Sequence, residues 1–124
     1  MRLTFKGGVH PFEGKELSKD CPVEKYLTKA DLAYPLSQHI GAPAKPVVAT
    51  GDHALAGQMI AEAGGFVSAP VLASVSGTVK GIEKRLTATG SMVDSIIVEN
   101  DGLSEEVEFH PADPASLTRE ELIG

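Results

Sequence analysis

The central part of the chain, residues 31–102, is built from short apolar runs separated by turn residues at intervals of roughly 8 to 12 positions. Glycine, proline and aspartate occupy most of these breaks, and no window of helical length is amphipathic. This spacing is typical of small all-β domains, so we expect a mostly β structure with a core of small and branched residues. The expected strands are 32–36, 46–50, 58–61, 66–68, 71–75, 78–84 and 92–99.

Four positions in this region are expected to form structural turns: Gly51, Asp52, Gly57 and Gly77. Glycine supplies the positive φ that tight turns often require, and an aspartate side chain can accept hydrogen bonds from nearby backbone amides. Gly81 lies inside the longest strand run and is expected to mark a β-bulge.

A weak internal repeat links residues 46–51 with residues 70–77. Each segment has a proline, then small or branched apolar residues, a hydroxyl residue and a turn glycine. The repeat predicts two similar β-units that fold onto each other and close one small barrel-like sandwich.

The two ends of the chain differ from this centre. Residues 1–30 open with an alternating segment from Leu3 to Phe5 that fits a short edge strand, followed by a polar arm expected to lie over another surface. Residues 103–124 are acidic, and Asp113 followed by Pro114 favours a short C-terminal helix. We interpret 103–124 as an acidic linker into a following domain that this chain does not contain.

The composition excludes several functions. One cysteine among 124 residues, Cys21, can supply neither an internal disulfide nor the four thiolates of an iron–sulfur cluster. The net charge of −6 and the lack of a clustered basic face argue against nucleic-acid binding. No apolar run approaches the roughly 20 residues of a membrane span, and the N-terminus has no signal-peptide pattern, so a cytoplasmic location is expected.

Few side chains offer chemistry. Gln38 and His39 leave an apolar strand and enter a Gly/Pro turn, a placement common in binding loops, although such a histidine more often hydrogen-bonds a loop to the core. The other histidines show no metal-ligand spacing, and no glycine-rich phosphate loop is present. We therefore expect no catalytic, cofactor-binding or metal-binding residues in this chain.

Residues 51–62, followed by 68–79, resemble the biotinyl/lipoyl carrier fold, which has two such units related by pseudo-twofold symmetry. Carriers of this kind place a modifiable lysine at the hairpin tip between the units. Here the tip is 61–66, and no lysine occurs between Lys45 and Lys80. Swinging-arm chemistry therefore has no attachment point.

Five motifs in the same order resemble the N-terminal domain of the C subunit of the Rnf ion-translocating electron-transport complex. They are Phe5–Pro11, Pro35–Ala44, the block of Gly51-Asp52 and Gly57-Gln58, Gly65–Val71, and Ser76–Val79. The A subunit of sodium-translocating NADH:quinone reductase is more distantly similar. The resemblance implies a barrel-sandwich hybrid, to which we add the extended N-terminal arm and the short C-terminal helix.

The family implies a peripheral subunit on the cytoplasmic face of the membrane. It passes electrons from NADH through FMN and two [4Fe-4S] clusters toward the membrane subunits, coupled to pumping of sodium or protons. In the family the flavin and cluster residues lie after this domain, so none is carried over to the present chain, which is expected to be catalytically silent.

These observations lead to a docking hypothesis, in which the chain contacts other subunits of the complex and the rest of its own polypeptide. The expected contact surfaces are the Gly7–Pro11 arm, the Gln38–Pro43 loop and the Glu62–Phe66 hairpin tip. Phe66, a large aromatic residue at a glycine-flanked tip, suits an interface anchor. The alternative for Phe66 is a place in the core of its own barrel.

The predicted interface residues are therefore Gln38, His39 and Phe66. Two rival functions remain open. One is a free-standing biotinyl-type carrier or small-ligand-binding domain. The other is an enzyme with an independent site, which would need a pocket that joins His39 to an acid such as Asp52 or Glu83.

Overall fold

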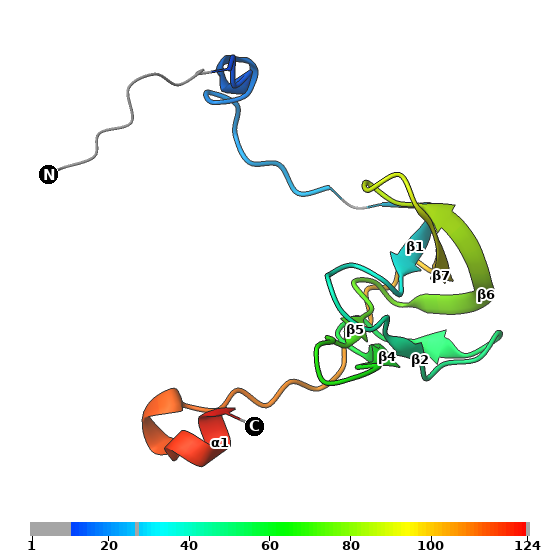
Figure 1. Ribbon diagram of the computed structural model, residues 1–124, viewed down its shortest axis with the longest axis vertical. Coiled ribbons are helices and arrows are strands. Elements are labelled where there is room, and N and C mark those ends of the chain that lie inside the picture. The colour runs from blue at the N-terminus through cyan, green and yellow to red at the C-terminus, as the bar shows by residue number, and fades with distance from the viewer. Residues whose placement is uncertain (1–10, 27, 124) are drawn as a thin grey trace, which may run out of the picture.

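The computed structural model describes residues 11–26 and 28–123, with the side chains of all of these except the last two. Outside this range lie the expected strand from Leu3 to Phe5 and all of the arm Gly7–Pro11 except Pro11. The described part of the arm, 11–26, extends away from the barrel and contains one short 3-10 turn, η1 (Lys15–Leu17) (Figure 1).

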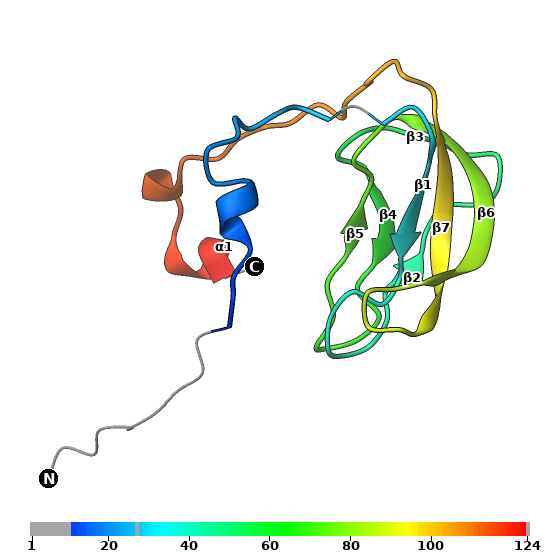
Figure 2. The ribbon, with the colours of Figure 1, turned by 90° about the horizontal axis from the view of Figure 1, so that it is seen from above.

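Within the described residues, seven strands form two antiparallel sheets (Figure 2). The larger sheet has the order β1-β7-β6-β3 and the smaller one the order β2-β4-β5. The expected mostly β fold is confirmed. The strands are β1 (Asp31–Pro35), β2 (Lys45–Pro46), β3 (His53–Ala54), β4 (Met59–Glu62), β5 (Val71–Leu72), β6 (Gly77–Leu86) and β7 (Met92–Asn100).

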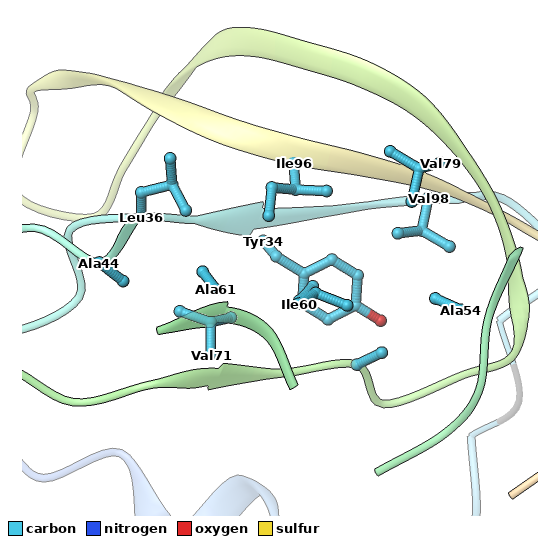
Figure 3. Close-up of a cluster of buried hydrophobic side chains, with 11 residues drawn as sticks. Tyr34, Leu36, Ala44, Ala54, Ile60, Ala61, Val71, Val79, Ile96 and Val98 are labelled. Carbon is cyan, nitrogen blue, oxygen red and sulfur yellow. The ribbon is translucent and has the colours of Figure 1, made fainter. Parts of the chain in front are cut away.

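One core lies between the sheets, and Figure 3 shows its side chains filling that space. Ile60 from the smaller sheet and Ile96 and Val98 from the larger one have no exposed surface. The remainder consists mainly of alanine, valine and leucine, so the core is built from small and branched residues as expected. Tyr34 is the one aromatic residue in this cluster.

The expected strand at 66–68 is wrong. Phe66 and Val67 form bends and Ser68 is irregular, and the carbonyl of Val67 bonds to another loop instead of a neighbouring strand. The amide of Ala42 donates to the carbonyl of Val67 over 2.9 Å. The two-residue strand β3 was not expected, because it is too short to show a period and forms only by pairing with β6.

The β-bulge expected at Gly81 is confirmed, since the register between β6 and β7 shifts between Val79 and Gly81. Gly81 has a φ of 150°. Gly51 and Gly57 also have positive φ values, 95° and 84°, and Asp52 accepts a hydrogen bond from the amide of Ala49 over 2.7 Å. Gly77 instead begins β6, where a Cβ would overlap the carbonyl oxygen of Glu99.

The internal repeat corresponds to two matching paths through the barrel. β2 and β5 flank β4 in the smaller sheet, and after each of them the chain crosses to the larger sheet. There β3 and β6 pair with each other, His53 opposite Thr78 and Ala54 opposite Gly77. The two repeated segments therefore run along equivalent crossings.

The C-terminal part contains a 3-10 turn, η2 (Pro114–Ser116), and a short helix, α1 (Arg119–Ile123). The carboxylate of Asp113 accepts a hydrogen bond from the amide of Ala115, with Pro114 at the first position of η2. Thr118 and Glu121 form a capping box at the start of α1, and the hydrogen bonds from the Thr118 amide and hydroxyl lower the pKa of Glu121. The expected short C-terminal helix is therefore present.

The barrel has two distinct ends (Figure 2). We call one end the loop pole, because it carries the three loops 36–44, 63–70 and 87–91. At the other end, which we call the terminal pole, the chain enters β1 and leaves β7, with Asp31 paired to Glu99. The two ends of the barrel segment therefore emerge side by side, and the loop pole faces away from both.

Candidate functional site

The three predicted interface residues lie on the loop pole. Gln38 and His39 belong to loop 36–44, and Phe66 belongs to loop 63–70. Three hydrogen bonds join the loops directly. The Ala42 amide donates to the carbonyl of Val67 over 2.9 Å, the Ser68 hydroxyl donates to the carbonyl of Ala42 over 2.8 Å, and the Ala69 amide donates to Nε2 of His39 over 3.0 Å. The structure thus brings these residues together on one connected surface.

His39 acts as a strut between the two loops. Because Nε2 accepts the Ala69 amide proton, Nδ1 carries the ring proton and donates to the carbonyl of Ile40 over 3.2 Å. Nε2 is therefore not free to act as a general base. Gln38 has a similar local role, since its Nε2 donates to the carbonyl of Pro35 over 2.9 Å.

Phe66 is fully exposed, at 105% of its reference surface, so the alternative that it packs into its own core is wrong. Ile40 from the adjacent loop is exposed to 97% and Val67 to 59%. Leu86 and Met92, paired at the base of loop 87–91, are also exposed. Large apolar side chains therefore gather at the loop pole.

Two shallow hollows flank the Gln38–His39 segment. The smaller, about 350 Å³, lies between β1 and loop 63–70 and is lined in part by Tyr34 and Pro70. The larger, about 670 Å³, lies between loops 36–44 and 87–91 and includes Thr89 in its lining. Gln38 and His39 line both hollows and form the ridge between them.

The structure does not join His39 to either acid that an enzymatic site would need. Asp52 bonds to the Ala49 amide, and Glu83 pairs with Arg85 over 2.7 Å. Neither acid lines a hollow that His39 lines. Cys21 is exposed, and its thiol donates a weak hydrogen bond to the carbonyl of Leu17 over 3.7 Å.

At the terminal pole, a polar network holds the exit of the chain against the barrel. The buried hydroxyl of Ser76 donates to Oδ1 of Asp101 over 2.7 Å and accepts the amide of Glu105 over 3.1 Å. The pKa of Asp101 is lowered by hydrogen bonds from three groups, which are the Ser76 hydroxyl, the Leu103 amide and the His53 ring. His53 is exposed, and its partner Asp101 is 48 residues away in sequence, so local spacing gave no signal of this contact.

Residues 105–107 continue along the barrel beyond this network. The Ala56 amide donates to the carbonyl of Glu105 over 2.8 Å, and the Val107 amide donates to the carbonyl of Ala56 over 3.0 Å. In the part of the chain that the structure describes, His53, Asp101 and Glu105 form the one group of three potential metal ligands, with ligand atoms within 4.8 Å of one another. Hydrogen bonding to His53 and Ser76 already accounts for the position of Asp101.

Between residues 11 and 123, leaving out residue 27, no helix is long and apolar enough to cross a membrane.

Comparison with known proteins identifies several similar sequences. Residues 3–103 match the family model of the RnfC barrel sandwich hybrid domain. The chain is 46% identical over 100 residues to the C subunit of the Na⁺-translocating ferredoxin:NAD⁺ oxidoreductase complex of Acetobacterium woodii, covering 81% of this chain and 23% of that protein.

Two further relatives cover nearly the whole chain. The C subunit of the proton-translocating ferredoxin:NAD⁺ oxidoreductase complex of Clostridium ljungdahlii is 37% identical over 126 residues, covering 100% of this chain and 28% of that protein. The C subunit of the ion-translocating oxidoreductase complex of Haemophilus influenzae (strain PittEE) is 36% identical over 122 residues, covering 96% and 19%. The matched part of the chain thus spans 19% to 28% of the length of these relatives.

Proposed function

Because the chain belongs to the RnfC barrel sandwich hybrid family, we propose that it is a non-catalytic docking domain of the C subunit of an Rnf-type electron-transport complex. Residues 1–30 form its arm, 31–102 the barrel and 103–124 the connection to a following domain. The hydrogen bonds of residues 105–107 to Ala56 keep the first part of that connection on the barrel.

In this proposal the whole complex moves electrons between NADH and ferredoxin and couples this transfer to ion translocation. We assign neither Na⁺ nor protons as the translocated ion, because one relative is named for Na⁺ and another for protons. The partners of the chain are the other subunits of the complex and the rest of its own subunit, which lies on the cytoplasmic face of the membrane.

The redox groups belong to other parts of the subunit. A [4Fe-4S] cluster requires four thiolates, and this chain offers only the exposed Cys21, so its residues do not fit a cluster. We likewise assign FMN to the part of the C subunit beyond this chain. No redox step is therefore attributed to the barrel.

The observation that carries the proposal is the position of the two chain ends. Both leave the barrel at the terminal pole, so the rest of a much longer polypeptide joins the barrel on that side, while the loop pole points away from it (Figure 2). A rigid barrel presented in this way is suited to contact another subunit. Neither hollow is lined by Asp, Glu, Lys, Arg or Cys, and both ring nitrogens of His39 are hydrogen-bonded to backbone groups, which favours binding over acid–base chemistry.

The proposal is tested with a hybrid subunit. In the C subunit of Acetobacterium woodii, the matching N-terminal segment is replaced by this chain, and a second form lacks that segment altogether. We expect the hybrid to bind a complex depleted of its C subunit, and the shortened form to lose binding while it still oxidises NADH with an artificial acceptor. Equal binding by the shortened form would contradict a docking role, as would NADH oxidation by the 124-residue chain alone.

A further inference from the structure

The loop pole is unusual for its lack of charge. None of the residues in 36–44, 63–70 and 87–91 is Asp, Glu, Lys or Arg, although these types make up 23% of the chain. Charged residues begin only at the strand ends beneath the loops, where Lys45 pairs in register with Glu62 and Lys84 pairs with Asp94 over 3.2 Å. The loops at the end of the barrel that faces away from the chain termini therefore carry no Asp, Glu, Lys or Arg, and His39 is their one titratable side chain.

The same surface is rich in large apolar groups. Phe66 and Ile40 expose essentially their whole side chains, and Val67 exposes more than half. Depletion of charge together with exposed aromatic and aliphatic anchors is typical of the centre of a protein–protein interface. On a protein that acted alone, such a group of side chains would favour aggregation.

The loop pole is also fixed in shape before any partner binds. Gly41 and Gly64 allow the two loops to touch backbone to backbone, because a Cβ at either position would overlap the carbonyl oxygen of Val67 or Pro43. The third loop is closed by the Thr87 hydroxyl, which donates to the carbonyl of Ser91 over 3.0 Å. A pre-organised surface loses little conformational entropy on binding, which favours a stable complex.

On the basis of the proposed function, we infer that the loop pole is the docking surface of the barrel and that its partner is an uncharged, apolar surface of another protein subunit. Phe66 and Ile40 are the anchors, and the hollows beside Gln38 and His39 receive side chains of that partner. Docking of a charged mobile protein would rely on complementary charge, and attraction to an anionic membrane surface would rely on lysine or arginine. The loops of this pole carry no Asp, Glu, Lys or Arg.

The test introduces Phe66→Ala and Ile40→Ser separately into the hybrid subunit and measures its dissociation constant for the complex depleted of its C subunit. Each change should raise the dissociation constant about tenfold or more, as expected for an anchor at the centre of an interface. The matched controls are Val47→Ser and Leu103→Ser, which alter exposed apolar residues outside the loop pole and should change binding less than about twofold.

Salt distinguishes an apolar contact from a charged one. The ratio of the Phe66→Ala and parent dissociation constants should stay constant within about twofold between about 50 and 500 mM salt, because no ion pair is lost. Because these side chains are exposed, the melting temperature of the 124-residue chain should stay the same in each variant, which separates loss of contact from loss of folding.

The outcomes separate the two proposals. If the shortened subunit binds as well as the hybrid, the docking role itself fails. If the barrel is required but both loop-pole variants bind normally, the docking role stands and the assignment of this surface is overturned. Co-sedimentation of the chain with neutral phosphatidylcholine vesicles, lost in Phe66→Ala, would replace the protein partner with a lipid one.

Discussion

The hydroxyl of Tyr34 links the two halves of the barrel, and its removal should have a measurable cost. The side chain extends from β1 in the larger sheet and is 8% exposed. Its oxygen lies 2.9 Å from Oγ of Ser74 and accepts the Ser74 amide over 3.1 Å. Ser74 follows β5 in the smaller sheet, so these bonds join the free edges of the two sheets.

Tyr34→Phe keeps the ring and its packing but leaves the Ser74 amide without its acceptor. Ser74 itself is exposed, so the cost is that of the two lost hydrogen bonds, each worth a net of about 0.5–1.5 kcal/mol. We therefore expect a loss of about 2 kcal/mol in the free energy of unfolding. For a barrel of this size, such a loss corresponds to a fall in melting temperature of about 8–16 °C. Ile60→Ala in the centre of the core should cost more, about 2–5 kcal/mol.

Ser74→Ala is the matched control for this prediction. It removes only the side-chain partner, so the amide still donates to Tyr34, and the loss should be about 0.5–1.5 kcal/mol. The free energies come from urea denaturation, with the slope unchanged among variants. A Tyr34→Phe variant within about 0.5 kcal/mol of the parent, the range of an ordinary surface substitution, would show that water replaces the bond and would refute the reasoning.

Three further predictions concern the two poles and the resemblance to carrier domains. The neighbours of Asp101 lower its pKa, so the stability that it contributes should be fully present above the unfolded pKa of about 3.9 and should be lost as pH falls through the lower folded pKa. Ser76→Ala removes one of these neighbours and should flatten this dependence in denaturation measured from about pH 2 to 6. Gly64→Ala should destabilise the chain by about 1–3 kcal/mol in thermal unfolding, because the new Cβ meets the backbone of Pro43, whereas Gly65→Ala, which meets only the side chain of Ala42 at 3.1 Å, should cost less. The intact mass of the chain from cells that attach biotin and lipoate should remain 13.0 kDa, and an added biotinyl or lipoyl group on any lysine would point to a carrier instead.

The general architecture could be predicted from the sequence because the turn residues are closely spaced and the strands between them are apolar. The family was recognisable for a related reason, since its motifs coincide with turns such as Gly51-Asp52, where only a few residue types fit. The bulge at Gly81 was predictable because a glycine inside an otherwise regular strand often marks a bulge or a close approach of another backbone.

Features that depend on contacts distant in sequence could not be predicted in this way. The apolar run around Phe66 has the composition of a strand, yet the backbone there bonds to loop 36–44, which the local pattern does not reveal. The pairing of His53 with Asp101 is hidden for the same reason. Sequence indicated Gln38, His39 and Phe66 one at a time, but only the fold places them on the same pole.

The neighbouring positions of the two chain ends also determine how the barrel responds to force. β1 and β7 are antiparallel, and both ends emerge at the terminal pole. Tension on the flanking segments would therefore first break the bonds of residues 105–107 to Ala56, and would then open the β1–β7 pairing from Asp31–Glu99 onward, one pair after another. In this zipper geometry the hydrogen bonds break one after another, so the sheet resists force less than it would if the strands had to slide past each other. The ion pairs of Lys80 with Asp31 and Glu99, at 3.0 and 3.5 Å, lie where the opening of the sheet begins, and with the bond from Ser76 to Asp101 they resist the separation of β1 from β7.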